Sequence, residues 1–392
     1  MWRNLASNAL TLILVLLFLG GGLITWAVNQ YQAPGPLAAP ICLRVESGSN
    51  IREVRDTLAG QGALAHPWIF GAGADYTDRA GQLKAGSFLV PAGASPAEIL
   101  DIVTRGGANT CGTQIVYTVG IAETLARVRE LDPETSAFDE IVRFAPLTEA
   151  APADYLRVRQ ERDTQYSVQI VEGVTSWQVV TALNALDILE GEVTTLPAEG
   201  TLAPDSYGVE PGTTVEALIG RMASAQAAIL AEAWANRADG VPVETPEEAL
   251  VLASIVEKET AIAEERPLVA SVLVNRIRQG MRLQFDPTII YGITRGVGLL
   301  DRPISNADIR GATEQNLHGD ILYNTYQIDG LPAGPIGNPG RAAIEAALNP
   351  AETEYLYFVA DGTGGHAFAT NLDDHNANVA RLREIEAQEQ AD

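Results

Sequence analysis

Two glutamates stand at the end of a largely apolar run. Residues 249–256 (ALVLASIV) are followed directly by Glu257 and, two positions on, by Glu259. Just before the run, Thr245–Glu248 has the form of a capping box, with Thr at the N-cap, Pro at the first helical position and Glu at the third. The pattern predicts a buried helix rather than an amphipathic surface helix. Carboxylates at the end of such a helix are costly unless they are paired or functional.

Burial and the negative end of the helix dipole both disfavour the carboxylate anion and therefore raise its pKa. A glutamate that stays protonated near neutral pH can donate a proton to the leaving oxygen of a glycosidic bond. Glu257 and Glu259 lie about 200° apart around a helix, so only one can face a given pocket. The other would be structural, with Lys258, Arg266 and Arg276 available as partners. The pattern alone also allows both to be ion-paired structural residues.

Further polar groups follow downstream. Gln284 can offer a donor and an acceptor to sugar hydroxyls. Asp286 precedes Pro287, which predicts an N-cap rather than a catalytic role. The segment YNTY (323–326) has flat aromatic faces and amides that suit a sugar subsite. The Pro/Gly-rich loop Gly330–Gly340 either brings backbone groups close to a ligand or is a rigid connector. The candidate substrate-binding residues are Gln284, Tyr323, Asn324, Tyr326 and Asn338.

Other titratable residues carry weaker signals. His366 and His375 are candidate polar groups near a site, although a lone histidine at a strand start is more often a packing or hydrogen-bonding residue. Glu199 and Asp205 sit in a turn-rich stretch and are expected to be exposed. The sequence lacks GxSxG, SxxK and HExxH, and its four histidines lack ligand spacing. This argues against serine acyl transfer and zinc chemistry, and we expect no metal and no cofactor.

An uncharged segment near the N-terminus has the length of a membrane span. Ala9–Val28 carries no charge, and about 20 apolar residues cross a hydrocarbon core. Arg3 places the N-terminus in the cytoplasm, and Trp26 and Tyr31 suit the outer interface. The alternative is a signal peptide cut near Ala38. In both cases the bulk of the chain is exported.

The net charge and the cysteines limit the partners and metal sites that the protein can have. A formal net charge of −24 argues against a nucleic-acid partner. The two cysteines, Cys42 and Cys111, fit no metal-binding spacing. In an oxidising compartment they could close a loop of about 70 residues, and two free thiols in the unreduced, denatured protein would reject that disulfide.

The rest of the chain reads as mixed α and β structure. Residues 41–113 predict a small α+β unit, and helices dominate from Thr213 onward. A β-hairpin is expected over residues 355–370. The polar, acidic stretch Asp132–Gln165 has no clear assignment.

Several motifs in order closely resemble the endolytic murein transglycosylase family, also called MltG or YceG-like. They are ASIVEKET (253–260), RLQFDPTIIYG (282–292), YNTYQIDGLPAGPIGNPG (323–340), ALNP (347–350) and YLYFVADGTGGHAFATN (355–371). KAGSFLVPAGASPAEIL (84–100) resembles the LysM-like unit of that family. Phe285 departs from the small polar residue usual there, Ala333 replaces a usual second Pro, and residues 115–165 form a longer segment than is typical.

The resemblance implies a lytic transglycosylase. Such an enzyme cuts the β-1,4 bond between N-acetylmuramic acid and N-acetylglucosamine in nascent peptidoglycan and leaves 1,6-anhydromuramyl ends, which would terminate glycan elongation. The family's catalytic glutamate matches Glu259. Expected partners are peptidoglycan strands, the inner membrane and peptidoglycan synthases. The alternative is a non-catalytic, membrane-anchored, peptidoglycan-binding scaffold of the synthesis machinery.

The resemblance and the patterns together predict an α+β protein. It has an N-terminal transmembrane helix, a LysM-like subdomain and a mainly helical, lysozyme-like catalytic domain with a C-terminal β-hairpin. The expected boundaries are a cytoplasmic tail (1–8), a transmembrane helix (9–29), a linker (30–40), a membrane-proximal region (41–196) and a catalytic domain (197–392). The protein is expected to be single-pass in the inner membrane with its catalytic domain in the periplasm.

Overall fold

The computed structural model describes residues 2–46, 48–105, 111–161, 164–311 and 320–389. The fold is mixed α and β with one apolar N-terminal helix, as the sequence predicts. The chain forms two compact units. Unit 1 comprises Met1–Ile115, Arg127–Arg143 and Ala151–Gln165, and unit 2 comprises Val116–Ala126, Phe144–Ala150 and Tyr166–Asp392.

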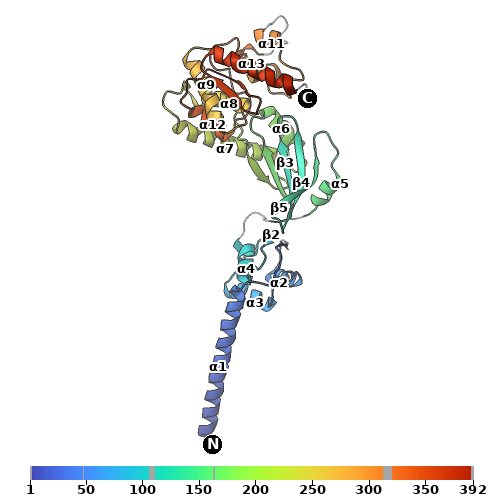
Figure 1. Ribbon diagram of the computed structural model, residues 1–392. Coiled ribbons are helices and arrows are strands. Elements are labelled where there is room, and N and C mark those ends of the chain that lie inside the picture. Colours follow the sequence, from blue (N-terminus) through green and yellow to red (C-terminus); the bar gives the residue numbers. More distant parts are fainter. Residues whose placement is uncertain (1, 47, 106–110, 162–163, 312–319, 390–392) are drawn as a thin grey trace. The chain divides into compact units, whose positions relative to one another are not determined.

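Unit 1 begins with α1 (Trp2–Gln32), the long helix drawn in blue in Figure 1. Within it, Thr11–Gln32 is the one stretch among the described residues that is long and apolar enough to cross a membrane. None of the most apolar window of that stretch is buried inside the protein. Both findings agree with a single-pass anchor.

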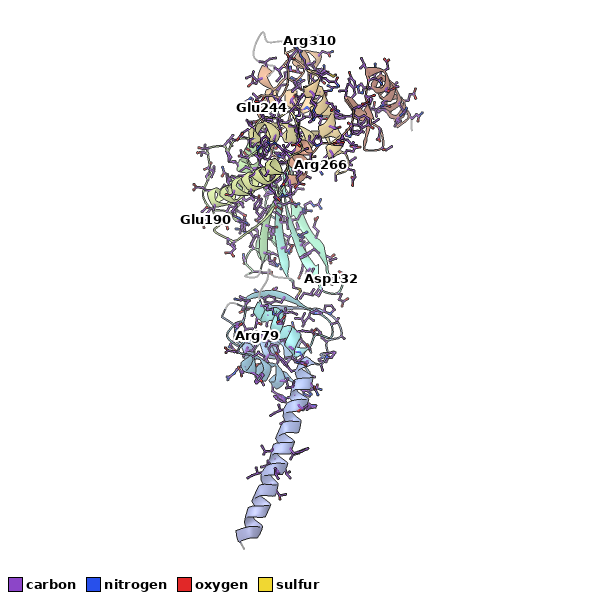
Figure 2. The ribbon with its side chains drawn as sticks, turned by 90° about the vertical axis from the view of Figure 1, so that its left-hand side faces the viewer. Arg79, Asp132, Glu190, Glu244, Arg266 and Arg310 are labelled. Carbon is purple, nitrogen blue, oxygen red and sulfur yellow. A yellow bond between two sulfur atoms is a disulfide. The ribbon has the colours of Figure 1, made fainter. Side chains whose placement is uncertain are left out.

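A small α+β body follows α1. Strand β1 (Ile41–Val45) pairs antiparallel with β2 (Gly86–Val90), with Leu43 opposite Phe88. Three helices complete the body: α2 (Ile51–Gly60), α3 (Pro67–Tyr76) and α4 (Pro96–Arg105). Its core contains Leu43, Leu58, Phe70, Val90 and Ile99. Cys42 and Cys111 are joined in a disulfide with their Cα atoms 5.6 Å apart, and Arg79, labelled in Figure 2, pairs with Asp101 at 2.8 Å.

The segment between α1 and β1 is held against this body. The Gly35 amide donates to the Gly93 carbonyl over 3.0 Å, and the Gly93 amide donates to the Leu37 carbonyl over 2.8 Å. Leu37 is buried. On α3, a Cβ atom added at Gly73 would overlap the Tyr31 ring at the end of α1. The anchor helix and the α+β body are therefore one connected piece.

A five-stranded sheet has the order β5-β4-β3-β6-β7. Its strands are β3 (Thr113–Val119), β4 (Thr124–Asp132), β5 (Ala137–Phe144), β6 (Gln165–Ile170) and β7 (Ser206–Val209). The stretch that the sequence left unassigned contains β5 and the short helix α5 (Ala153–Val158). β5 is an edge strand whose residues are mostly exposed, so it lacks the alternation that reveals a half-buried strand.

The remainder of unit 2 is mainly helical. Its elements are α6 (Ser176–Ala185), α7 (Val215–Ala235), α8 (Pro246–Glu259), α9 (Arg266–Arg278), α10 (Asp286–Thr294), α11 (Asn306–Arg310), the 3-10 turn η1 (Ile321–Tyr323), α12 (Arg341–Leu348), the hairpin β8 (Tyr357–Ala360) and β9 (His366–Ala369), and α13 (Leu372–Glu389). Helix α8 lies in the core, where it packs against α7, α9 and α12. This core fixes the end of α8, where the two candidate glutamates stand.

Candidate active site

Helix α8 forms where the sequence predicts it. Thr245 is its N-cap and accepts a hydrogen bond from the Glu248 amide over 3.2 Å, and Pro246 opens the helix. The second half of the predicted capping box is wrong: the Glu248 carboxylate accepts from the Glu244 amide at 2.6 Å instead of from Thr245. Every residue from Ala249 to Val256 is buried. The helix ends at Glu259 with that carboxylate at its last position.

Glu257 is held by a structural network. Its Oε2 accepts a hydrogen bond from the Gly340 amide over 2.8 Å, and its Oε1 lies 3.6 Å from the Arg266 guanidinium. Arg266, labelled in Figure 2, also pairs with Glu172 at 3.3 Å. The Glu257 side chain is 4% exposed. These bonds tie the end of α8 to the loop that precedes α12.

Glu259 has a different environment. Its Oε1 is buried with no hydrogen-bond partner among the described residues. Burial, together with the nearby charge of Asp286, raises the pKa of Glu259 to about 8. A carboxyl group with this pKa is protonated at neutral pH, the state that a general acid requires. The two glutamates thus have different surroundings, as their spacing along the helix predicts.

The side chain of Glu259 lines a cavity of about 560 Å³, here called the Glu259 pocket. Polar groups from two segments line it, and the hairpin and α13 supply further walls. Its lining includes Arg276, Gln284, Asp286, Tyr326, Tyr357, Phe358, Leu372 and His375. The structure therefore brings together three of the predicted site residues: Glu259, Gln284 and Tyr326.

Asp286 was not predicted as a pocket residue, and the predicted N-cap role is wrong. Phe285 is the N-cap of α10, and Asp286 is the first helical residue with no side-chain cap. Its Oδ1 instead accepts a hydrogen bond from the Tyr326 hydroxyl over 2.7 Å. Because the partner lies 40 residues away, no local signal in the sequence could have revealed this pair.

The backbone turns sharply at Gln284. Its φ is +60°, a left-handed conformation that is uncommon for a residue other than glycine. The Gln284 amide donates to the Thr325 carbonyl over 3.1 Å, which joins the two polar segments of the pocket. Arg276 holds the turn in place, because its guanidinium donates to the Leu283 carbonyl at 2.7 Å and to the Leu356 carbonyl at 2.7 Å. Strained backbone of this kind is often found at functional sites.

The predicted histidines have distinct roles. His366 Nδ1 lies 2.6 Å from Glu265 Oε2, and the same carboxylate accepts from the Thr260 hydroxyl over 3.2 Å. This bridge fastens the hairpin to the residue that follows Glu259. His375 lines the Glu259 pocket and stacks on Tyr357, with ring centroids 5.2 Å apart.

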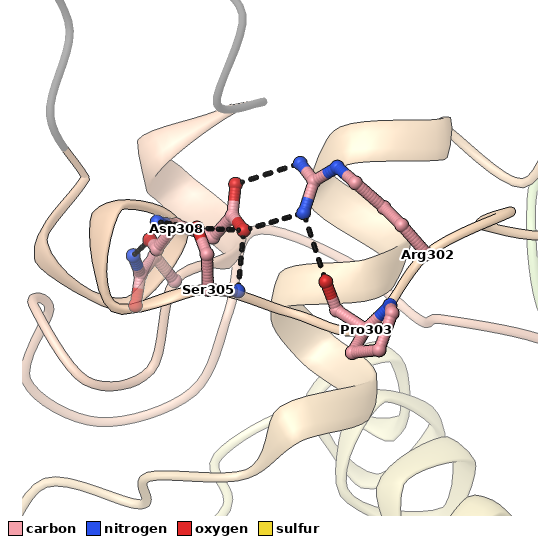
Figure 3. A network of polar contacts seen from close by, with 5 residues as sticks. Arg302, Pro303, Ser305 and Asp308 are labelled. Carbon is pink, nitrogen blue, oxygen red and sulfur yellow. Dashed lines mark hydrogen bonds and ion pairs between the residues drawn. The ribbon is translucent and has the colours of Figure 1, made fainter.

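Tyr323 and Asn324 lie outside the Glu259 pocket. Tyr323 is buried against Tyr291, with ring centroids 4.9 Å apart. The side-chain Nδ2 of Asn324 donates to the backbone carbonyl of Asp308 over 3.0 Å. Asp308 is itself fully buried and accepts two hydrogen bonds from Arg302, a network shown in Figure 3. These contacts hold the segment of Tyr323 and Asn324 against α10 and α11.

Asn338 also lies outside the Glu259 pocket. It is completely buried, its Oδ1 accepting from the Leu202 amide over 2.9 Å and its Nδ2 donating to the Val174 carbonyl over 3.0 Å. The loop containing it makes close backbone contacts, since a Cβ atom at Gly337 would lie 2.6 Å from the Gly173 carbonyl oxygen. The loop does make a close backbone approach, and the segment it approaches here is another loop of unit 2.

Glu199 differs from its predicted exposed state. It is half-buried and accepts hydrogen bonds from the Ser176 amide at 2.8 Å and the Tyr291 hydroxyl at 3.0 Å. Burial raises the pKa of Glu199 despite these bonds. It lines another cavity, beside the start of α8, whereas Glu259 stands at the helix's other end. Asp205 is exposed as expected.

Within the described ranges, no three His, Cys, Asp or Glu side chains form a group that could hold a metal ion. The chemistry that the Glu259 pocket can perform with its own residues is proton transfer. Glu259 can supply a proton, and the polar side chains of Gln284, Asp286 and Tyr326 line the same pocket.

The chain is similar in sequence to known proteins. A protein from Streptococcus pneumoniae named endolytic murein transglycosylase is 30% identical over 347 residues, covering 87% of this chain and 58% of its own length. A Bacillus subtilis protein of the same name is 35% identical over 181 residues, 46% of either chain. The chain thus spans little more than half the length of its pneumococcal relative.

A crystal structure of a yceG-like protein from Listeria monocytogenes aligns with 87% of this chain and 99% of that one, at 24% identity and a TM-score of 0.41. The model of the YceG-like family matches residues 43–381, which include parts of both units and every residue of the Glu259 pocket. The protein belongs to the YceG-like family.

Proposed function

We propose that the chain is an endolytic lytic transglycosylase. Its substrate is the β-1,4 bond between N-acetylmuramic acid and N-acetylglucosamine in nascent peptidoglycan, and its products carry 1,6-anhydromuramyl ends, which terminates strand elongation. The observation that carries the proposal is the state of Glu259, whose Oε1 is buried without a partner and whose pKa is raised to about 8. Membership of the YceG-like family and the names of the two curated relatives support the same activity.

One carboxyl group suffices for this reaction. Glu259 donates its proton to the glycosidic oxygen as the bond from that oxygen to C1 of the muramic acid breaks. The C6 hydroxyl of the same sugar then attacks C1, and its proton passes to Glu259, which restores the starting state. Hydrolases need a second carboxylate to hold water or a covalent intermediate. Here the attacking oxygen belongs to the substrate.

Gln284 and Tyr326 are the substrate-binding residues we propose, because their side chains line the Glu259 pocket. Tyr323, Asn324 and Asn338 contribute indirectly by holding the loops around it. The catalytic domain extends from about residue 197, and we propose that it is lysozyme-like. The membrane-proximal region (41–196) contains the LysM-like subdomain.

We propose that α1 is retained as an anchor in the inner membrane, with the N-terminus in the cytoplasm and the catalytic domain in the periplasm. The contacts of Tyr31 with Gly73 and of Gly35 with Gly93 support retention, since cleavage near Ala38 would remove them. At this location the enzyme meets strands as peptidoglycan synthases extend them, and those synthases are its proposed partners.

The test is the chemistry of the products. The full chain in detergent is incubated with uncrosslinked peptidoglycan, and the released fragments are analysed by mass spectrometry. Fragments with anhydromuramyl ends from within the strands support the proposal. Fragments ending only in reducing muramic acid would refute the transglycosylase reaction, and no cleavage would refute the enzyme assignment.

A further inference from the structure

Three aromatic side chains gather where α1 meets the α+β body of unit 1. Trp26 on α1 lies with its ring centroid 5.1 Å from that of His66 and 6.3 Å from that of Trp68. His66 is the N-cap of α3, and Trp68 belongs to the first turn of that helix. Trp26 is 40% exposed and Trp68 50% exposed. The body thus presents a large aromatic ring to its surroundings beside the anchor.

The position of Trp68 relative to α1 is fixed by packing. Helix α3 packs against α1, with Gly73 in contact with the Tyr31 ring. Ile69 and Phe70, the two residues after Trp68, are buried in the body. Trp68 therefore stays at the height of Trp26 along α1.

That height corresponds to a membrane interface. Arg3 is the last charge before the uncharged run, and about 20 residues at 1.5 Å each cross the hydrocarbon core. The uncharged span Ala9–Val28 therefore ends close to Trp26. Trp26 lies in the last turn of that span, near the outer interface, where tryptophan is enriched because its ring is apolar and its N–H can form hydrogen bonds. Trp68 lies in the same zone.

We propose that Trp68, together with Trp26 and His66, forms a membrane-contact surface that seats the α+β body on the phospholipid headgroup region. The surrounding sequence suits this partner, since no Asp, Glu, Lys or Arg occurs from Thr57 to Ala74 in a chain of net charge −24. Gly71 and Ala72, one turn after Trp68 on the same side of α3, are small and uncharged. An acidic surface there would be repelled by anionic lipids.

The consequence is a body that lies directly on the bilayer rather than on a free tether. A helix alone would leave the helix and the body, as one connected piece, free to tilt in the bilayer. A second aromatic contact beside the helix restrains that tilt and fixes how unit 1 leaves the membrane. This surface lies outside the Glu259 pocket and outside the proposed reaction, although it rests on the proposed role of α1 as an anchor.

The test measures the depth of Trp68 in a bilayer. Full-length chains that keep one tryptophan, either Trp68 or Trp26, are made by changing the other four to Phe and are placed in phosphatidylcholine vesicles. The acyl chains carry bromine, which quenches tryptophan on contact, either near the headgroup or near the chain end. The vesicles contain lipid and this protein alone, so quenching of Trp68 identifies lipid as the occupant.

We expect both tryptophans to be quenched to a similar extent, and more by bromine near the headgroup than near the chain end. Quenching of Trp26 without quenching of Trp68 would overturn the contact surface while leaving the anchor intact. Absence of quenching at both would refute the anchor itself, and the contact surface with it. Trp68→Phe in the otherwise natural chain provides a second measurement, since it should reduce the fraction of fluorescence that bromine quenches.

Discussion

The hydroxyl of Tyr326 donates a hydrogen bond of 2.7 Å to Oδ1 of Asp286 within the Glu259 pocket. The pair joins the start of α10 to the loop after η1, two segments that lie far apart in the sequence. It also places the Asp286 carboxylate near the buried Glu259, whose pKa burial and the charge of Asp286 raise to about 8.

Tyr326→Phe should lower kcat/KM by roughly tenfold, because a hydrogen bond to a charged group is worth about 1.5–3 kcal/mol and its loss leaves Asp286 less well placed. Tyr323→Phe is the matched control. It also removes a tyrosine hydroxyl, but from a residue whose ring packs on Tyr291 outside the Glu259 pocket. Steady-state kinetics on uncrosslinked strands should separate the two variants. Equal losses in both would contradict the placement of Tyr326 at the substrate.

The activity should depend on pH through Glu259. Burial and the charge of Asp286 raise its pKa to about 8, so the acid form persists at neutral pH and kcat/KM should fall as the pH rises through about 8. Asp286→Asn removes the nearby negative charge, so this fall should move to lower pH. Asn can still accept the Tyr326 hydrogen bond. The exposed Asp205→Asn serves as control, and a shift of the same size there would remove Asp286 as the cause.

The free energy of unfolding should also depend on pH through Glu259. The folded pKa of Glu259 lies at about 8, above the ordinary value of 4.5 for a glutamate, so the folded state holds a proton that the unfolded state releases. The stabilisation is complete below about pH 4.5 and is lost as the pH rises to about 8. Glu259→Gln should therefore gain stability relative to the natural protein across this window, by on the order of 5 kcal/mol. Urea unfolding of both proteins at several pH values measures this difference in the free energy of unfolding. A difference that does not change with pH would contradict the raised pKa.

The Cys42–Cys111 disulfide should contribute to the stability of unit 1. It closes a loop with a sequence separation of 69, for which the loss of unfolded-state entropy is worth about 3–4 kcal/mol. Reduction should lower the free energy of unfolding by that amount, and the unreduced, denatured protein should contain no free thiol. Two free thiols would reject the bond.

The sequence predicted the elements whose signals are local. Helix α8 was readable because Thr245, Pro246 and the apolar run lie within one segment, and the divergence of Glu257 and Glu259 follows from helical geometry. The pairing of Asp286 with Tyr326 was not readable, since it depends on a contact across 40 residues. Polar type alone could not distinguish Tyr326, which lines the pocket, from Asn338, which loop packing buries.

The choice between the two glutamates is tested most directly by single-turnover cleavage of defined glycan strands with Glu259→Gln and Glu257→Gln in the full chain. A general acid contributes about 10²–10⁴-fold, so Glu259→Gln should lose at least 100-fold in rate while circular dichroism shows a native fold. Glu257→Gln should weaken the bonds to Gly340 and Arg266 and lower stability, yet retain cleavage. Cleavage retained by Glu259→Gln and lost by a folded Glu257→Gln would contradict the assignment of Glu259.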